Sequence, residues 1–357
     1  MEARSTVIKA TVTICVFICL CIIIYLENMK MFYLPTSNNT LEPQPQWSQY
    51  SYSGFVNRVT ALRHPSLRSR CSCVTFGYRM RGGIGNHLFY YSATVYVAWL
   101  TGRHICLLTS SRKLILNELF DIHIPQVNIK KYRCPSYKFK QRGVGLYDAR
   151  VESLINISPN KYLLLDGYFQ SWMYAHTIAA QLRQDLCFKK ELKEFVADFL
   201  SRTVPLGWSK LKFVRVGVHV RRGNFLTKSG LVFGYTSAGE RYLQKAMTYF
   251  VKQFPRVQFI VSSNDIKWCQ KHMTLHNFNK TNVNIVFSVK HSAGQDLALL
   301  ASCNHTVMST GTYSWWAAWL ANGTTIYYAN YPNNGSLLSR SFRNKEYYYP
   351  HWIGMTT

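Results

Sequence analysis

The sequence predicts an α/β protein whose C-terminal half forms a doubly wound parallel sheet. Two observations carry this prediction. Short apolar runs rich in Val and Ile alternate with longer stretches of helical periodicity. Polar residues follow these runs at their carboxyl ends, which is the edge where such sheets bind ligands. With 357 residues, the chain can bury a sizeable core and has room for two domains.

The first expected element is a membrane span over residues 10–26, which are uncharged and dense in Ile, Val, Cys and Leu. This length is at the short limit for crossing a bilayer, and short spans suit the thinner early secretory membranes. Arg4 and Lys9 before it favour a cytoplasmic N-terminus. A cleaved signal peptide is the rival interpretation, but no small residues for a cleavage site follow Leu26. We expect a cytoplasmic tail over residues 1–9, an uncleaved signal anchor and a lumenal body, as in a single-pass type II protein of the Golgi membrane.

Residues 27–70 are rich in Pro, Gln, Asn, Ser and Tyr and have no sustained period. This composition is typical of a stem that holds a folded body away from a membrane. Exposure to the lumen agrees with glycosylation sequons at Asn38, Asn279, Asn322 and Asn334. Two further sequons are expected to be unused, because Pro159 follows the one at Asn156 and because Asn304 leads into a predicted buried strand.

Seven cysteines lie outside the predicted span: Cys71, Cys73, Cys106, Cys134, Cys187, Cys269 and Cys303. An oxidising lumen allows disulfides, but the number is odd and the pairing cannot be read from the sequence. Cys71 and Cys73 resemble half of a metal site, but no second pair of this spacing follows.

In the N-terminal half of the body, the apolar runs predict strands over Cys73–Phe76, His104–Leu108 and Tyr162–Leu165 and a helix over Leu88–Leu100. The first strand and the helix are joined by Gly82-Gly83-Ile84-Gly85-Asn86-His87. Glycines at such a turn let backbone amides and a helix N-terminus approach a ligand closely. The third glycine of a dinucleotide fingerprint is missing, so this turn alone does not identify a ligand.

In the C-terminal half, strands are predicted over Phe213–Val220, Val257–Val261, Val283–Phe287, Thr306–Met308 and Thr325–Tyr328. Helices are predicted between them, over Glu240–Phe254, Asp265–Met273, Gln295–Ala301 and Tyr313–Ala321. Trp315, Trp316 and Trp319 recur at helical spacing, which favours packing over sugar stacking. The tyrosines 347–349 near Trp352 can line a site or pack a C-terminal segment, and the sequence does not choose between these.

Two adjacent arginines, Arg221 and Arg222, end the first of these strands. Guanidinium groups hold phosphate through forked, charge-assisted hydrogen bonds, so this strand end resembles a diphosphate site. The alternative is a solvated strand end. Further polar groups follow the other strands at the same sheet edge, namely Ser262-Ser263-Asn264, His291, Ser292, Asp296 and Ser309-Thr310-Gly311-Thr312. Their placement at one edge favours a nucleotide site.

The charge balance limits the classes of partner. The formal net charge is +26, although only 16% of residues are charged, because acidic residues are scarce. Such a balance permits nucleic acid, an anionic membrane surface or an acidic ligand. Since there is no zinc-finger spacing and no basic helix with heptads, we expect no nucleic-acid partner. Nothing in the sequence decides whether the chain forms a homodimer.

Several blocks together resemble a known family: Gly82-Gly83-Ile84-Gly85-Asn86-His87-Leu88-Phe89, Gly167-Tyr168-Phe169-Gln170-Ser171, His219-Val220-Arg221-Arg222-Gly223-Asn224, Ser262-Ser263-Asn264 with Trp268-Cys269, and Cys303-Asn304-His305-Thr306 through Gly311-Thr312 with Trp316-Ala317-Ala318. In this order they resemble the α-1,2-fucosyltransferases, the galactoside 2-alpha-L-fucosyltransferases of glycosyltransferase family eleven. The resemblance covers Cys73 to Trp352. The His-x-Arg-Arg block is shared with the wider group of GDP-fucose enzymes and so implies the donor more than the linkage.

The resemblance implies a GT-B-like fold, in which two Rossmann-like domains face each other across a cleft. The N-terminal domain, residues 71–210, would lie on the acceptor side, and residues 211–357 would bind GDP-fucose. The implied reaction moves L-fucose, with inversion, from GDP-fucose to the 2-hydroxyl of a terminal galactose on a glycoprotein or glycolipid glycan. A fucosyltransferase of different linkage or acceptor, and a catalytically silent glycan-binding homologue, are the alternatives. A membrane scaffold without a ligand is a third.

The resemblance also implies roles for single residues. Arg221 would bind the β-phosphate and neutralise the departing GDP, while His219 and Asp296 would contact the guanine. The full set expected to bind the donor is His219, Arg221, Arg222, Ser263, Asn264, Asp296, Thr310, Gly311 and Thr312. Arg222 can instead brace the loop, and Asn86 would lie across the cleft near the fucose and the acceptor.

No cofactor and no metal is expected. Metal-using transferases commonly hold their ion with an Asp-x-Asp pair, and this sequence contains none. An arginine clamp can supply the positive charge that the leaving diphosphate needs.

The sequence departs from the family pattern at two positions. Asn224 stands where vertebrate-type members carry Asp, and His87 stands where the family usually has Gln. Asn cannot act as a general base, so Asn224 puts a base at this position in doubt. Asp166 is the alternative candidate for a base, and its other interpretation is a turn-capping residue.

Overall fold

The computed structural model describes residues 71–77, 82–108, 115–128, 131–275, 278 and 281–357. All of them lie in one compact unit, Ser53–Thr357. The predicted tail, anchor and stem and the sequons at Asn38 and Asn279 are therefore outside the described part of the chain. Within that part, no helix is long and apolar enough to cross a membrane.

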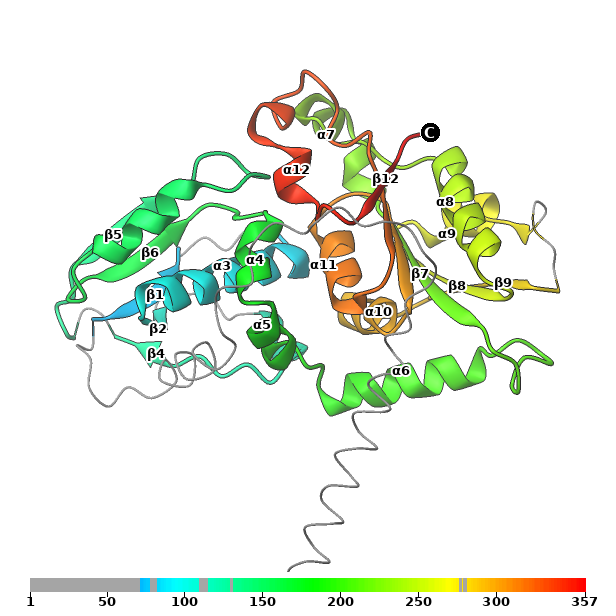
Figure 1. Cartoon of the computed structure of the whole chain (residues 1–357), viewed down its shortest axis with the longest axis horizontal. Coiled ribbons are helices and arrows are strands. Elements are labelled where there is room, and N and C mark those ends of the chain that lie inside the picture. Colours follow the sequence, from blue (N-terminus) through cyan, green and yellow to red (C-terminus); the bar gives the residue numbers. More distant parts are fainter. Residues whose placement is uncertain (1–70, 78–81, 109–114, 129–130, 276–277, 279–280) are drawn as a thin grey trace, which may run out of the picture. The chain divides into compact units, whose positions relative to one another are not determined.

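The N-terminal half contains a four-stranded parallel sheet in the order β2-β1-β6-β5 (Figure 1). Its strands are β1 (Cys73–Phe76), β2 (His104–Ile105), β5 (Ser136–Lys140) and β6 (Tyr162–Asp166). A separate pair of short strands is formed by β3 (Leu107–Leu108) and β4 (Gln126–Val127). The strands predicted over Cys73–Phe76 and Tyr162–Leu165 are confirmed.

The single strand predicted over His104–Leu108 is wrong, because the chain changes partner at Cys106. The Cys106 amide donates to Val74 of β1, whereas the next amide, of Leu107, donates to Pro125. The run is therefore divided between two sheets. Strand β5 was not predicted, since only Phe139 among its five residues is buried and lysines occupy the alternate positions.

The C-terminal half contains a six-stranded parallel sheet in the order β12-β11-β10-β7-β8-β9. Its strands are β7 (Val214–Val220), β8 (Val257–Ser263), β9 (Val283–Phe287), β10 (His305–Met308), β11 (Thr325–Tyr328) and β12 (Ile353–Met355). The doubly wound sheet predicted for this half is confirmed, and only the short edge strand β12 was not predicted. The buried part of β7 consists of three valines, Gly217 and His219, which fits a strand covered on both faces.

The helices are α3 (Ile84–Thr101), α4 (Trp172–Thr177), α5 (Ala179–Asp185), α6 (Lys190–Arg202), α7 (Lys228–Phe233), α8 (Glu240–Gln253), α9 (Ile266–His272), α10 (Ala293–Ala301), α11 (Thr312–Ala321) and α12 (Asn344–Tyr347), with 3₁₀ turns η1 (Ile115–Glu118), η2 (Ala149–Asn156), η3 (Gly223–Leu226) and η5 (Ser339–Ser341). Helix α3 begins at Ile84 rather than at the predicted Leu88, so Gly85 and Asn86 belong to its first turn. Helix α10 begins before the predicted Gln295, because Ser292 and Gln295 form a capping box there.

Two helices pack against the half of the body to which they do not belong by sequence. Helix α6 comes before residue 211, yet Val196 and Phe199 pack with Ile260 of β8 and with α10, beside which α6 lies in Figure 1. Conversely, α12 returns to the N-terminal half, where Ser171 donates to the Glu346 carbonyl at 2.5 Å. The domain boundary between residues 210 and 211 stays a prediction.

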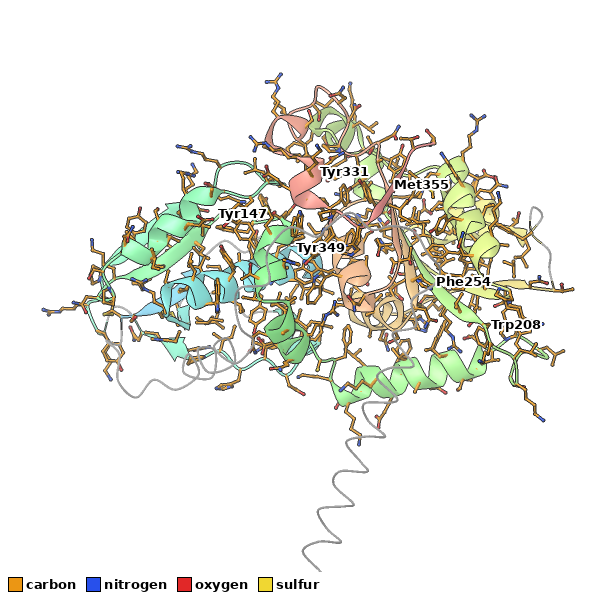
Figure 2. All side chains as sticks on the ribbon, in the orientation of Figure 1. Tyr147, Trp208, Phe254, Tyr331, Tyr349 and Met355 are labelled. Carbon is orange, nitrogen blue, oxygen red and sulfur yellow. A yellow bond between two sulfur atoms is a disulfide. The ribbon has the colours of Figure 1, made fainter. Side chains whose placement is uncertain are left out.

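Aromatic packing joins the two halves through α3 and α11. The Phe89 ring lies 4.7 Å from Trp315 and 5.2 Å from Trp316, centroid to centroid. Trp315, Trp316 and Trp319 are buried, which confirms their predicted packing role. The tyrosines 347–349 are buried as well, and Figure 2 labels Tyr349, whose ring contacts Trp315 at 5.8 Å. They pack the C-terminal segment.

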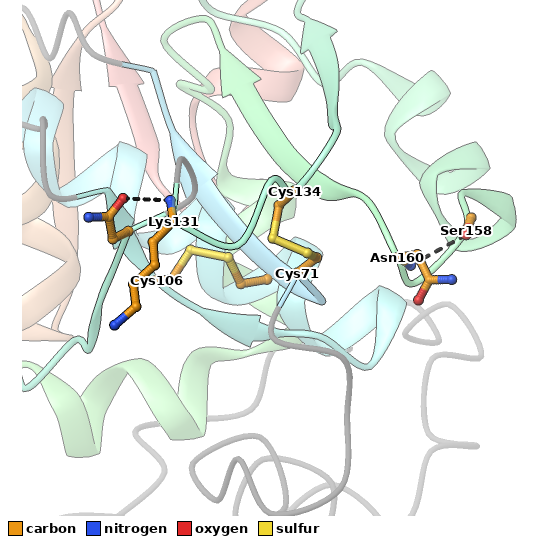
Figure 3. Close-up of a disulfide and its surroundings, with 8 residues drawn as sticks. Cys71, Cys106, Lys131, Cys134, Ser158 and Asn160 are labelled. Carbon is orange, nitrogen blue, oxygen red and sulfur yellow. Dashed lines mark hydrogen bonds between the residues drawn. A yellow bond between two sulfur atoms is a disulfide. The ribbon is translucent and has the colours of Figure 1, made fainter.

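Two disulfides close the start of the N-terminal sheet (Figure 3). Cys71 pairs with Cys134, and Cys73 pairs with Cys106. Three cysteines are free, of which Cys187 is exposed while Cys269 and Cys303 are buried. Burial raises the pKa of Cys269 to about 11 and that of Cys303 to about 12, so both thiols stay protonated at neutral pH.

The asparagines of all four sequons within the described residues, Asn156, Asn304, Asn322 and Asn334, are exposed. The Asn304 amide oxygen accepts a bond from the Arg215 backbone at 2.9 Å, and Thr306 is fully buried. These contacts agree with the expectation that the sequon at Asn304 is unused, which stays a prediction. Use of the other sequons stays a prediction.

Loss of the Cys73–Cys106 disulfide is expected to destabilise the protein. This disulfide closes a loop with a sequence separation of 33, so the Cys73→Ala, Cys106→Ala double variant should lose about 2–4 kcal/mol of unfolding free energy. Urea unfolding of the full-length protein in detergent measures this loss. Cys187→Ala is the control, because that thiol is free and exposed. An unchanged midpoint in the double variant would contradict the expectation.

Candidate functional site

Polar side chains meet at the carboxyl edge of the six-stranded sheet, as the sequence predicts. The Arg221 amide after β7 donates to Ser309 Oγ after β10 at 2.8 Å. On the other side of β7, Ser263 Oγ donates to the Val220 carbonyl at 2.7 Å. Because all these strands are parallel, their ends lie at one edge, where the loops can form a single site.

Arg221 is a half-buried cation at this edge. Its guanidinium donates a hydrogen bond to the Asn224 side-chain oxygen and lies over the Phe225 ring, 5.2 Å from its centroid. The Phe225 ring in turn stacks on Tyr235 at 4.1 Å. Burial lowers the pKa of Arg221, but an arginine stays charged at neutral pH. Asn224 takes one of the five guanidinium donors, and a charge held on an aromatic platform suits an anionic ligand.

Arg222 makes different contacts from those of Arg221. Its Nε lies 3.1 Å from the Asp265 carboxylate, and its guanidinium covers the Trp268 ring at 3.8 Å. Its backbone amide donates to Asn264 Oδ1 at 2.9 Å. These contacts fix the loop after β7 to α9, which is the bracing role kept as the alternative for Arg222. Asn264 contributes to the same bracing.

His219 lies beneath the edge rather than on it. Only 5% of its surface is exposed, and its Nδ1 lies 2.5 Å from Ser314 Oγ. The ring also packs on Tyr313, with 4.7 Å between centroids. Burial, helped by the nearby charge of Arg221, lowers the pKa of His219 to about 3. The imidazole is therefore neutral at physiological pH.

Asp296 is a half-buried carboxylate in the first turn of α10. Ser262 donates to its Oδ2 at 2.7 Å, and Ser288 donates to its Oδ1 at 2.5 Å. Burial raises the pKa of Asp296, while the two hydroxyl groups oppose this rise because they stabilise the ionised form. The arrangement presents a carboxylate acceptor at the edge formed by β8 and β9.

The N-termini of α3 and α11 meet at Asn86. Its Oδ1 accepts from Thr312 Oγ1 at 2.9 Å and from Gln170 Nε2 at 3.2 Å. The approach requires glycine, since a Cβ on Gly85 would lie 2.5 Å from the backbone of Thr312. Gly311 precedes α11 with φ 88°, a conformation that favours glycine. Both helix N-termini carry partial positive charge, which suits phosphate.

The Gln170 side chain is presented by an unusual backbone. Phe169 has φ 52°, which is rare for a bulky residue. Gln141 Oε1 holds this turn by accepting from the amides of Tyr168 and Phe169, at 3.0 and 2.7 Å. Such a conformation persists where the surroundings impose it, and here it directs Gln170 toward Asn86.

The remaining predicted residues are placed as follows. Thr310 is buried and donates to the Thr236 carbonyl at 3.2 Å, so it shapes the loop before α11. Asp166 forms an ion pair with Lys138 of β5 at 2.8 Å rather than a turn cap. His87 is buried on α3, and burial lowers its pKa.

Several site residues were not predicted. Ser288 directly follows the predicted strand Val283–Phe287, so the rule that selected Ser262 would also have found it. Ser314, Tyr235 and Phe225 carried no local signal. Their roles arise from tertiary contacts with His219 and Arg221.

Within the described residues, no three His, Cys, Asp or Glu side chains lie close enough together to hold a metal ion. Metal independence stays a prediction.

Comparisons with known proteins agree with one another. The family model described as "Glycosyl transferase family 11" matches residues 52–356. The pig protein named Galactoside alpha-(1,2)-fucosyltransferase 2 is 31% identical over 77% of this chain and 78% of its own length. The bovine Galactoside 2-alpha-L-fucosyltransferase SEC1 is 29% identical over 78% of this chain and 73% of its own length. Among solved structures, a mutant of Arabidopsis thaliana FUT1 in complex with GDP aligns with TM-score 0.50 and 13% identity over 81% of this chain and 78% of that one, which supports a shared fold.

Removing the His219 imidazole is expected to flatten the acid dependence of stability. The unfolded state takes up a proton near the ordinary histidine pKa of about 6.5, whereas the folded state does so only near 3. Between these values the unfolded state binds more protons, so the unfolding free energy falls as the pH falls. In His219→Asn, whose amide can still bond Ser314, the slope should decrease by up to about 1.4 kcal/mol per pH unit.

Urea unfolding of both proteins at several pH values from 7 to 4 measures the two slopes. Parallel stability curves would show that His219 titrates normally in the folded protein.

Proposed function

The chain belongs to glycosyl transferase family 11, and we propose that it is a galactoside α-1,2-fucosyltransferase. It moves L-fucose from GDP-fucose to the 2-hydroxyl of a terminal galactose, on a glycoprotein or glycolipid glycan, with inversion at the anomeric carbon. The names of the relatives support this reaction, and their match covers about three quarters of each chain. The observation that carries the proposal is the half-buried Arg221 on its aromatic platform, at the sheet edge where parallel sheets bind nucleotides.

The two sheets support a GT-B-like arrangement. In it, residues 71–210 and 211–357 are Rossmann-like domains, the first on the acceptor side and the second binding GDP-fucose. Asp296 accepts from the guanine edge. His219 supports the first turns of α11 from below, since its Nδ1 is already bonded to Ser314. The turn Thr310-Gly311-Thr312 and the loop Ser263-Asn264 surround the diphosphate.

Arg221 stabilises the transition state through its charge. Departure of GDP leaves negative charge on the diphosphate while the fucose gains oxocarbenium character. A preorganised guanidinium and the N-terminus of α11 lower the barrier, because they need no reorganisation as this charge develops. Asn224 holds the guanidinium in place through its side-chain oxygen. Arg222 keeps the loop fixed through Asp265 and does not touch the substrate.

Asn86 lies where the donor and acceptor sides meet. Its Oδ1 is occupied by Thr312 and Gln170, so its position is fixed before the substrate arrives. Asn224 cannot take a proton from the acceptor hydroxyl. Asp166, the alternative base, is already paired with Lys138. A transition state with advanced leaving-group departure needs little help from a base, which agrees with a site dominated by positive charge.

We also propose that the uncharged segment 10–26 anchors the protein in the Golgi membrane, with the body in the lumen. The two disulfides of the body support an oxidising compartment.

The second candidate is a catalytically silent, glycan-binding homologue. Asn224 favours it, since vertebrate-type members of the family carry Asp there. Binding of GDP and a galactoside without release of product distinguishes this candidate from the enzyme.

Transfer to terminal galactosides tests the proposal. Full-length protein in detergent, supplied with GDP-fucose and a panel of terminal β-galactosides, should release GDP and form an α-1,2-fucosylated product with or without EDTA. Arg221→Ala should lower kcat/KM about 10²–10³-fold, because it removes the cation that faces the diphosphate. Arg241→Ala, an exposed arginine on α8, is the matched control.

Absence of transfer to every acceptor would contradict the enzyme, and loss of activity in EDTA would contradict the metal-independent clamp.

A further inference from the structure

The Asp296 carboxylate is held by three polar side chains that the transfer chemistry does not use. Ser262, at the end of β8, donates to Oδ2 at 2.7 Å. Ser288, directly after β9, donates to Oδ1 at 2.5 Å. His291, in the loop before α10, places its Nδ1 2.7 Å from Ser288 Oγ. Each carboxylate oxygen thus accepts from one serine hydroxyl, and Ser288 is itself hydrogen-bonded to His291.

The direction of these hydrogen bonds follows from the available protons. An ionised carboxylate only accepts, so both hydroxyl groups give their single proton to Asp296. Ser288 can then only accept from His291, which therefore carries a proton on Nδ1. The chain of donors runs from His291 to Ser288 to Asp296, and neither end can reverse without breaking a bond.

The histidine is fixed from its other side by α6. The His291 ring makes edge contacts with Phe195 at 4.8 Å and with Phe199 at 5.6 Å. Phe199 is itself buried in the cluster that joins α6 to α10. Ser262 and Ser288 are also buried, at 2% and 5% exposed. The orientation of the carboxylate is thus set by packed groups on four different elements.

This arrangement leaves a defined set of free acceptors. Each carboxylate oxygen offers two lone pairs, and the serines use one on each oxygen. Each oxygen thus keeps one lone pair for a donor on a ligand, and two N–H groups side by side on a base can each bond one oxygen. A guanine edge supplies such a pair through its N1–H and its 2-amino group. Hypoxanthine supplies only the N1–H, and adenine presents a ring acceptor in that place.

We propose that Ser262, Ser288 and His291 are positioning residues that set the base selectivity of the donor site for guanine over hypoxanthine and adenine. They do so because they hold the Asp296 carboxylate with one free lone pair on each oxygen. The inference rests on the proposed function in one respect, namely that Asp296 meets the base of the nucleotide. A site built to bond two N–H groups rejects an analogue that lacks one of them, since a buried acceptor is then left unpaired.

Calorimetric titration of the full-length protein with GDP, IDP and ADP tests this inference without relying on turnover. The wild-type protein should bind GDP about 10–100-fold more tightly than IDP, since a hydrogen bond to a charged group is lost, and ADP should bind no better than IDP. In Ser288→Ala and Ser262→Ala, the ratio of IDP to GDP dissociation constants should fall at least about fivefold. IDP should lose less affinity than GDP, because hypoxanthine makes one hydrogen bond to Asp296 where guanine makes two.

Variants of His291 distinguish a positioning role of this residue from a packing role. His291→Ala should lower the GDP-to-IDP preference in the same direction, by a smaller factor. His291→Asn should restore it, since the amide N–H can donate to Ser288 as Nδ1–H does. Ser302→Ala, an exposed serine at the other end of α10, is the matched control and should leave the preference unchanged.

Four outcomes are informative. A reduced preference, in which GDP loses more affinity than IDP, supports the inference. An equal loss for GDP and IDP, or an unchanged ratio in both Ser288→Ala and His291→Ala, overturns it and leaves the proposed function standing. If Ser288→Ala fails to fold, Ser288→Thr, which keeps the hydroxyl, and the His291 pair decide by the same ratio. A wild-type protein that binds no GDP overturns the proposed function and the inference together.

Discussion

The contact on which the site depends is the approach of the α3 N-terminus to the α11 N-terminus at Gly85. A Cβ there would lie 2.5 Å from the backbone carbon of Thr312, closer than real Cβ contacts, so only glycine permits it. The next residue, Asn86, can then bond the Thr312 hydroxyl at 2.9 Å. Each helix follows a strand of a different sheet, so this one contact brings two positive helix ends together. The donor and acceptor sides of the proposed site therefore meet at a residue without a side chain.

Aromatic packing makes this approach stable. Phe89 lies against Trp315 and Trp316, all fully buried, and large buried aromatic rings contribute several kcal/mol each. The C-terminal segment adds a second connection, since Trp172 donates to the Lys345 carbonyl at 2.9 Å. These contacts hold the two sheets as one unit around the polar edge. Because the groups of such a site are already ordered, substrate binding costs little free energy for ordering them.

The sequence predicted the C-terminal sheet well because its central strands β7 and β8 are rich in Val and Ile and are mostly buried. It predicted the N-terminal sheet less well. Four of the five residues of strand β5 are exposed, so it lacks the apolar run that marks a buried strand. The run at Cys106 is divided because neighbouring residues pair with different strands, which only the tertiary fold decides. For the site, the sheet-edge rule found Arg221 and Asp296. The contact of Arg222 with Trp268 and the stacking of Phe225 on Tyr235 could not be predicted, because both depend on the tertiary fold.

The central claim is that residues from both halves act as one site through Asn86 and Thr312. A double-mutant cycle with Asn86→Ala and Thr312→Val, measured as kcat/KM for fucosyl transfer, tests it most directly. If the two side chains act together, the double variant should lose less activity than the sum of the single losses, with a coupling of about 1 kcal/mol or more. Losses that add independently would show that the two halves contribute separately and would contradict the account.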